Sequence, residues 1–219
     1  MVNRMRYRLR ISTALLTCVW AATSFAETPT PADEGFVSLF NGKDLSHWVV
    51  MGKATSWKVQ GGVIRSEGGS GGYWLRSKKR YEDFVFQVEW KISSGGNSGV
   101  YIRSAEEKNP WETGYEIQIS NAPRDALHCT GALYGHFAVN PRPDESPNRW
   151  HTFEIHCRGT QLKVIADGVV CVEADQAQSA TAKNKPLHGY VGLQDAHAPV
   201  GHYVEYRNVK IKELSPRLD

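Results

Sequence analysis

Short runs of β-branched and aromatic residues, separated by Gly, Asn, Asp and Pro, recur along almost the whole chain. This pattern is typical of strands joined by turns, and almost no segment has the periodicity of a helix. About a dozen strands favour an all-β fold with two packed antiparallel sheets, a β-sandwich of the jelly-roll kind, over a small barrel. The predicted strands span residues 56–60, 63–66, 73–75, 84–92, 98–104, 114–120, 131–135, 151–158, 161–166, 169–173, 189–194 and 203–213.

Two dipeptides mark tight hairpins between neighbouring predicted strands. Asp167-Gly168 is a strong signal for a two-residue turn, and Gly61-Gly62 is another. The polar, Ala-rich segment 175–186 is predicted to be a loop or to contain one short helical turn.

Residues 1–26 have the composition of a secretory signal peptide. Four arginines and no acidic residue precede an apolar stretch over 11–19, which is too short to span a membrane, and Ala26 offers a cleavage point. A lipoprotein box that ends at Cys18 is the alternative, and it would leave this cysteine as a lipid anchor. We therefore expect a secreted or periplasmic protein.

After this leader, the sequence predicts a Pro-rich linker over 27–34, one domain over 35–214 and a short tail over 215–219. Removing the leader takes four of the 26 basic residues, so 22 remain against 23 acidic ones and the net charge becomes −1. No basic run is left to bind nucleic acid. We expect no nucleic-acid partner and no membrane contact beyond a lipid anchor, and the oligomeric state stays open.

Three cysteines follow the leader, namely Cys129, Cys157 and Cys171. At most one internal disulfide can form among three, and Cys157 and Cys171 flank a predicted hairpin and could pair. We favour the alternative, in which all three are buried thiols that pack as small apolar groups. Their spacing matches no zinc site.

Side chains alternate across a strand, so odd and even positions separate the core from the surface. Apolar residues alternate with Glu116 and Gln118 in one strand, and the same alternation sends Tyr101, Arg103 and Gln194 outward from two others. Planar hydrogen-bonding groups beside a tyrosine suit a sugar, because its hydroxyls bind such groups and its ring packs on an aromatic face. The alternative is a solvated sheet face with cross-strand pairs such as Arg103 with Glu116.

Several short motifs resemble, in their order, the 3-keto-disaccharide hydrolase family. The motifs are LFNGKDLSHW (39–48), DF (83–84), EW (89–90), GNSGVYIR (96–103), YEIQI (115–119), GALYG (131–135), NRWH (148–151), GYVGLQ (189–194) and YRNVKI (206–211). The resemblance covers about residues 35–214 and implies a concanavalin A-like jelly roll. It also implies an exported enzyme that acts on glycosides whose C3 hydroxyl has been oxidised to a ketone. The segment 195–202 is longer than the compact loop expected in this family, so the identity of a functional histidine there stays open.

The chemistry expected for such a substrate needs one base rather than two carboxylates. Standard glycosidases use two carboxyl groups, whereas the strand here carries Glu116 and then Gln118. A ketone at C3 acidifies the C2 hydrogen, so one base can start elimination of the C1 substituent, and water can then add back. The reaction also needs a group that stabilises the enolate oxygen and an acid for the leaving group.

We assign roles to the candidate residues as hypotheses. Glu116 is the base, or else it holds a divalent metal ion that polarises the ketone, in which case Asp195 and His197 are further candidate ligands. Arg103 and Gln118 are the candidates that hold the sugar and the oxyanion. His128 or Tyr134 is the candidate acid, with His197 as a second choice. Asn97, Tyr101 and Gln194 are expected to line the groove, and Trp111 and Trp74 to stack on sugar rings.

Each candidate has an ordinary structural alternative. His128 and His197 fall in loops, where a solvated histidine is common, and Tyr134 could simply pack. Large aromatic residues dominate sandwich cores, so we expect core roles for Trp48, Trp57, Trp90 and Trp150. At the level of function, the alternatives to an enzyme are a non-catalytic carbohydrate-binding module and an interaction domain that uses the sandwich as a scaffold.

Overall fold

The computed structural model describes residues 34–105 and 109–215. The predicted signal peptide, the lipid anchor at Cys18, almost all of the linker and most of the tail lie outside the described residues. No helix in the described part is long and apolar enough to cross a membrane.

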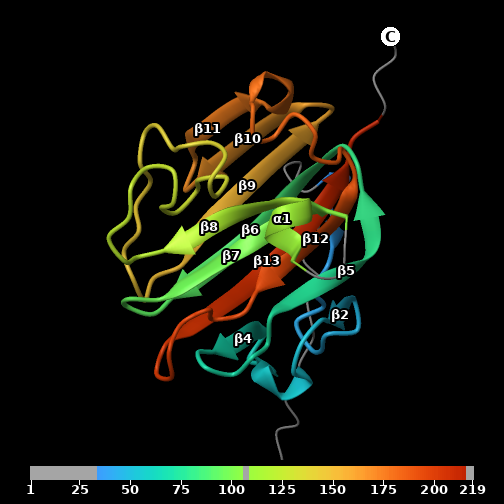
Figure 1. Ribbon diagram of the computed structural model, residues 1–219. Helices are drawn as coiled ribbons and strands as arrows, with labels where there is room; N and C mark the ends of the chain where they lie inside the picture. Colours follow the sequence, from blue (N-terminus) through green and yellow to red (C-terminus); the bar gives the residue numbers. More distant parts are fainter. Residues whose placement is uncertain (1–33, 106–108, 216–219) are drawn as a thin grey trace, which may run out of the picture. The chain divides into compact units, whose positions relative to one another are not determined.

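Two antiparallel sheets make up the domain, which confirms the predicted all-β sandwich (Figure 1). The eight-stranded sheet has the order β11-β10-β9-β6-β13-β4-β3, and β1 pairs with β13. Its strands are β1 (Val37–Ser38), β3 (Trp57–Gln60), β4 (Val63–Glu67), β6 (Phe84–Ile92), β9 (His151–Arg158), β10 (Gln161–Ala166), β11 (Val169–Asp175) and β13 (Tyr203–Glu213). The five-stranded sheet has the order β2-β5-β12-β7-β8. Its strands are β2 (Trp48–Val50), β5 (Trp74–Tyr81), β7 (Asn97–Ser104), β8 (Tyr115–Ser120) and β12 (Gly189–Gln194).

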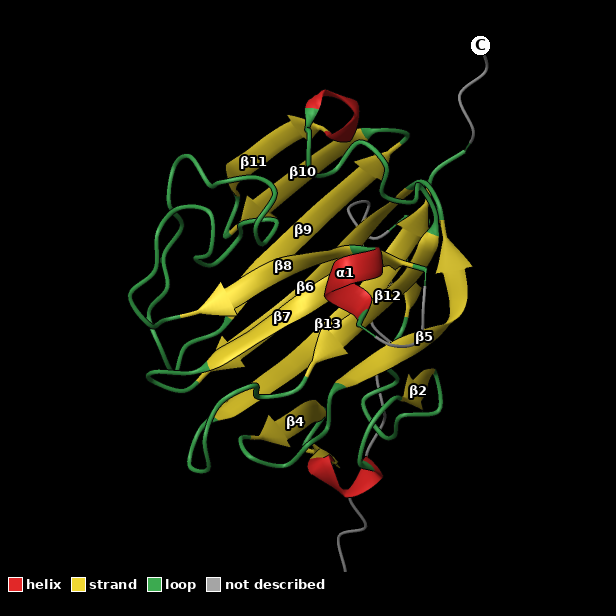
Figure 2. Ribbon diagram, in the orientation of Figure 1, coloured by secondary structure: helices red, strands yellow, loops and turns green. Residues whose placement is uncertain are grey.

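Helical structure in the described residues is confined to single turns. The four-residue helix α1 (Pro110–Thr113) packs against β7 and β8 (Figure 2). The 3₁₀ turns span Ala54–Ser56 and Gln176–Gln178. The second of these is the short helical turn that the composition of 175–186 allowed.

Alternating apolar residues from both sheets form one buried core. On β8, for example, Ile117 and Ile119 are fully buried on the core side. Trp90 packs against Phe153 with ring centroids 5.2 Å apart, and Trp48 and Trp57 are also buried, as predicted.

The core prediction for Trp150 is wrong. This ring is only partly buried, and the cations of Lys91 and Arg207 lie 4.9 Å and 4.1 Å from its centroid. Trp150 therefore packs beneath charged side chains at the surface, where cation–π attraction replaces burial.

Both predicted hairpins are present. Gln60 pairs with Val63 and Ala166 pairs with Val169, so two residues connect the strands in each case. The φ angles of the connecting residues are all positive, as such turns require.

The strand predicted over 131–135 is wrong. Only Leu133 forms isolated bridges, to Ile117 and Phe137, while Gly131 and Gly135 take φ angles of 84° and 72°. The glycines turn the chain around β8, although the Tyr134 amide still donates to the Glu116 carbonyl over 2.9 Å. This contact brings Tyr134 beside the strand that carries Glu116.

Cys129, Cys157 and Cys171 are free and buried. The preferred prediction of unpaired thiols is confirmed, and the alternative Cys157–Cys171 disulfide is wrong. Burial raises the pKa of Cys157 to about 12 and that of Cys171 to about 11, so both are protonated thiols at neutral pH.

Candidate active site

A cavity of about 830 Å³ lies over the outer face of the five-stranded sheet. Alternate residues of neighbouring strands form its floor, because Tyr101 pairs with Glu116 and Gln194 pairs with Trp74. The loops around the sheet form the walls. The lining residues are Gly69, Gly71, Tyr73, Trp74, Asn97, Tyr101, Pro110, Trp111, Glu116, Gln118, Arg124, Tyr134, Gln194, Asp195, Ala196, His197, Ala198 and Pro199. Such a volume is typical of small-molecule sites.

Glu116 is the buried carboxyl group on the floor of this cavity. Burial raises its pKa from 4.5 to about 7, although a hydrogen bond with Gln194 and the charge of Arg124 act in the opposite direction. The strand opposite leaves room for the side chain, since a Cβ atom on Gly99 would lie 2.7 Å from Glu116 Oε1. A carboxyl group with a pKa near neutrality can take up and release a proton under physiological conditions.

Side-chain amides surround this carboxyl group. The amide nitrogen of Gln118 lies 3.0 Å from Asn97 Oδ1, and in the opposite amide orientation it lies 3.1 Å from Glu116 Oε1. Gln194 donates to the hydroxyl of Tyr101, and its Oε1 atom is buried with no partner among the described residues. An unsatisfied buried acceptor costs free energy, so the Gln194 side chain is held here against that cost.

Aromatic side chains border the same floor. The Trp74 ring meets Tyr101 edge-on, with centroids 5.4 Å apart, and it covers the backbone of Gly192, where a Cβ atom would lie 2.3 Å from the ring. Trp74 is only 2% exposed and offers little surface for the predicted stacking, whereas Trp111 on α1 is 41% exposed and Tyr134 is 37% exposed. Partly exposed aromatic rings at a cavity offer packing surfaces to an apolar sugar face.

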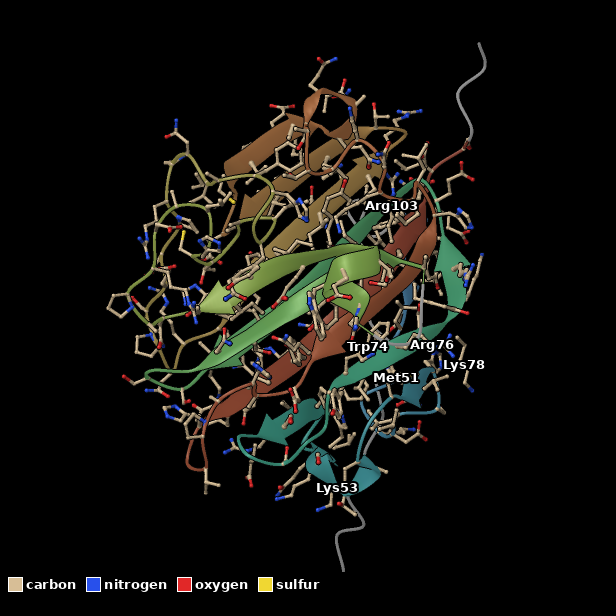
Figure 3. The ribbon with its side chains drawn as sticks, in the orientation of Figure 1. Met51, Lys53, Trp74, Arg76, Lys78 and Arg103 are labelled. Atoms are coloured by element: carbon tan, nitrogen blue, oxygen red, sulfur yellow. The ribbon has the colours of Figure 1, made fainter. Side chains whose placement is uncertain are left out.

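The prediction that Arg103 lines the groove is wrong. Residues 102 and 103 of β7 lie opposite the single residue Val191 of β12, because Tyr101 pairs with Gly192 and Ser104 pairs with Tyr190. This β-bulge, in which Arg103 has a φ of 51°, interrupts the alternation on which the prediction depended. In Figure 3, Arg103 lies well apart from Trp74, which is one of the lining residues of the cavity.

The Arg103 side chain is fully buried elsewhere in the domain. Its guanidinium group donates to the carbonyl oxygens of Glu82 and Gly159 over 2.6–3.2 Å and to Asp83 Oδ1 over 3.3 Å. It is a structural residue that connects turns.

The predicted histidines lie in different environments. His128 is absent from the cavity lining; its Nδ1 atom lies 2.8 Å from Asp125 Oδ1, and its ring meets Tyr134 edge-on at 4.7 Å. His197 borders the cavity with an exposed side chain, and its carbonyl oxygen accepts a hydrogen bond from Asn97 over 3.3 Å. Tyr134, rather than His128, is therefore the candidate acid with access to a ligand.

The three candidate metal ligands border the cavity but do not form a metal-binding cluster. Within the described residues, no three His, Cys, Asp or Glu side chains are grouped so that they could hold a metal ion. Asp195 instead accepts a hydrogen bond from the Tyr73 amide over 3.0 Å, and burial raises the pKa of its carboxyl group. Glu116, Asp195 and His197 therefore do not fit the metal site that the sequence suggested.

The sequence-based selection missed Arg124, which follows β8 and borders the cavity. It stands in the irregular segment Asn121-Ala122-Pro123-Arg124, where no strand alternation assigns a direction to its side chain. The one available signal was its place as the first cation after the strand that carries Glu116.

Comparisons with known proteins show the family of the chain and relatives of its fold. The chain matches the family described as 3-keto-alpha-glucoside-1,2-lyase-like domain over residues 35–212. A 3-keto-disaccharide hydrolase from Bacteroides thetaiotaomicron is 29% identical over 240 residues, which cover 86% of this chain and 81% of that protein.

Solved structures show the same fold. A protein from Parabacteroides distasonis, assigned as a glycosyl hydrolase, is 24% identical with a TM-score of 0.73 over 86% of this chain and 99% of that chain. The β-glucanase of Bacillus licheniformis is 16% identical with a TM-score of 0.52 over 82% of this chain and 97% of that chain. The resemblance noted in the sequence is thus confirmed. The chain belongs to the family of 3-keto-alpha-glucoside-1,2-lyase-like domains and, at the level of that family, is a glycoside hydrolase-like enzyme.

Proposed function

We propose that this chain is an exported enzyme that cleaves 3-keto-glycosides by elimination followed by hydration. The observation that carries the proposal is Glu116, a buried carboxyl group with a pKa near 7 on the floor of a cavity lined by amides and aromatic rings. The composition of residues 1–26 supports export to the periplasm or the cell exterior. The substrate class follows the names of the family and of the Bacteroides thetaiotaomicron relative.

In the elimination step, the carboxylate of Glu116 removes the C2 hydrogen of the sugar as a proton. The electron pair of the C–H bond first forms an enolate with the C3 carbonyl and then a C1–C2 double bond, while the bond from C1 to the leaving oxygen breaks. Tyr134 gives its hydroxyl proton to that oxygen, and an alcohol or a second sugar leaves. Tyr134 is suited to this step because it borders the cavity and its backbone is bonded to that of Glu116.

Hydration reverses the proton transfers. The hydroxyl group of a water adds to C1, the second proton of the water returns to Tyr134, and Glu116 returns its proton to C2. The products are a free 3-keto sugar and the released alcohol, so the net reaction consumes one water. The word lyase in the family name fits the first step alone, and the word hydrolase in the name of the relative fits both steps.

The side chains on the floor bind and orient the sugar. Gln118 and Asn97 form one pair of planar groups beside Glu116, and Gln194 on β12 lines the cavity beyond β7. The exposed ring of Trp111 packs on a sugar ring, and the buried Trp74 supports Tyr101 on the floor. The cavity has room for a sugar and its leaving group together.

Replacing the base tests this function. Glu116→Gln keeps the shape of the side chain but cannot accept the C2 proton, so kcat on a 3-keto-disaccharide should fall by about 10²–10⁴-fold while sugar binding is retained. Product NMR in deuterated water measures both turnover and deuterium incorporation at C2. Glu154→Gln, on the opposite sheet, is the matched control and should keep full activity.

The stability of this variant separates chemistry from folding. Burial raises the pKa of Glu116 in the folded protein, so ionisation of this group costs stability as the pH rises through about 7. Glu116→Gln should therefore melt no lower than wild type at pH 8. If turnover survives in the variant, Glu116 is not the base; if wild type binds glycans but never cleaves 3-keto-glycosides, a binding module replaces the enzyme.

A further inference from the structure

Arg124 is the only lining residue of the described cavity with a permanent positive charge. Arg124 borders the same space as Glu116, and its charge lowers the pKa of that carboxyl group. The two side chains nevertheless form no hydrogen-bonded ion pair. A cation and a carboxyl group thus face one cavity without neutralising each other by contact.

The fold holds Arg124 in place from two directions. Its Nε atom donates to Ser120 Oγ over 3.2 Å, and Ser120 ends β8 on the same face as Glu116 and Gln118. Its carbonyl oxygen accepts a hydrogen bond of 2.8 Å from Arg142, which is itself fixed by a two-point contact with Glu145 at 2.6 Å and 3.0 Å. Such fixation costs little further entropy when a ligand binds.

The two terminal nitrogens of Arg124 have no hydrogen-bond partner among the described residues. Other arginines of the domain contact carboxylates, and the pairs are Arg65–Glu205, Arg103–Asp83, Arg142–Glu145, Arg149–Asp144 and Arg207–Glu89. Arg124 thus presents unused donors in a fixed planar arrangement. Such a group suits an oxygen atom on which negative charge develops.

We propose that Arg124 is a catalytic residue that binds the C3 oxygen of the keto sugar and stabilises the enolate formed when Glu116 removes the C2 proton. This inference rests on the proposed function. The proton leaves C2, and the negative charge appears on the oxygen of the neighbouring carbon, so the base and the cation must act at adjacent atoms. Arg124 and Glu116 border the same cavity, and Arg124 supplies the charge that the sequence had assigned to Arg103.

Kinetics of Arg124→Met and Arg124→Lys test the assignment. Because the guanidinium group acts on charge that is greatest in the transition state, Arg124→Met should lower kcat by about 10²–10³-fold with a smaller change in KM. Arg124→Lys should recover part of the loss. Arg149→Met, an exposed arginine of the same connection, is the matched control and should behave as wild type.

The pH profile provides a readout that a merely structural role would not change. The acid limb of kcat/KM should rise through about pH 7 in wild type, because the carboxylate form of Glu116 is the base. Removing the charge of Arg124 should move this limb to higher pH, and lysine should restore it. The other titratable side chains that border the cavity are Tyr73, Tyr101, Tyr134, Asp195 and His197, and they are unchanged in these variants.

Two results would overturn the inference. One is an Arg124→Met variant that keeps kcat within about threefold of wild type or changes KM alone. The other is a lowered kcat with an unmoved acid limb in a variant that melts at a lower temperature, which indicates a structural role.

A failure of the proposed function would look different. If wild type cleaves no 3-keto-glycoside, the dissociation constants of a 3-keto-disaccharide and of its unoxidised parent can be compared. This comparison tests whether Arg124 contacts the C3 oxygen. A preference for the ketone that Arg124→Met removes would support the contact at C3, and equal binding of both sugars would refute it.

Discussion

Glu116 and Gln118 stand two positions apart on one face of β8, yet their surroundings give them different chemistry. Glu116 has Gly99 beside its carboxyl group and little water around it, so its pKa rises to about 7. Gln118 has no charge to lose and can only donate and accept hydrogen bonds. A buried acid whose pKa lies near neutrality, with neutral amides beside it, is suited to general-base catalysis.

Gly99→Ala tests how closely the carboxyl group must be placed. The added methyl would lie 2.7 Å from Glu116 Oε1 and 2.8 Å from its Cγ atom, so the side chain must move. We expect kcat to fall by about tenfold or more with the fold retained, because displacements of an ångström at a reacting group are costly. Steady-state kinetics and thermal unfolding measure the two effects.

The double variant Gly99→Ala/Glu116→Asp provides the control for this prediction. The shorter side chain removes the contact at Oε1 and keeps the one at Cγ, so the loss of kcat in the double variant should be smaller than the sum of the two single losses. Strictly additive losses would show that Gly99 acts independently of Glu116.

At the scale of elements, α1 is a single helical turn that carries Trp111 to the cavity. Four residues are too few for a helix that is stable in isolation, so outside contacts must hold it. The Nζ atom of Lys185 donates to the carbonyl oxygens of Trp111, Glu112 and Gly114 over 2.5–3.3 Å. One ammonium group therefore satisfies the open end of the turn, where a positive charge is favoured.

Lys185→Met should release this turn while preserving the apolar part of the side chain. We expect a higher KM with a smaller change in kcat, because the role proposed for Trp111 is to pack on the sugar away from the reacting atoms. We also expect a loss of about 1–3 kcal/mol in unfolding free energy. Lys183→Met, an exposed neighbour, is the control and should alter neither value. An unchanged KM in Lys185→Met would mean that α1 needs no such support.

At the scale of the whole domain, Arg103 connects the two sheets at one end of the sandwich. It extends from β7 in the five-stranded sheet to the turn before β6 and the turn after β9, both next to the eight-stranded sheet. A fully buried guanidinium group needs every one of these acceptors. The bulge at Arg103 directs this side chain away from the cavity and toward the carbonyl oxygens of Glu82 and Gly159.

Arg103→Met should therefore lower stability and spare catalysis. Removal of the guanidinium group leaves the carbonyl oxygens of Glu82 and Gly159 and the carboxylate of Asp83 without this donor, at a cost of about 3–5 kcal/mol in unfolding free energy. Denaturant unfolding measures the loss. The folded variant, assayed well below its melting temperature, should keep wild-type kcat and KM; a raised KM would instead support the original sugar-binding assignment.

Strand alternation and turn residues determined most of the fold, because they are local properties of the chain. The bounds of β6, β9, β10, β12 and β13 follow directly from the sequence, as does the shared face of Tyr101, Glu116, Gln118 and Gln194. The short edge strands β1 and β2 escaped prediction because they have two and three residues and depend on their partners.

Only the tertiary structure decided what depends on residues far apart in the chain. The bulge at Arg103 is a shift in the pairing of β7 with β12, two strands that are far apart in the chain. No local sequence pattern reveals such a shift. Arg124 enters the cavity because Ser120 and Arg142 hold it there, and the raised pKa of Glu116 is a consequence of desolvation by several elements at once. Alternation along one strand is set by backbone geometry, whereas burial, charge and cavity are created when separate strands pack together.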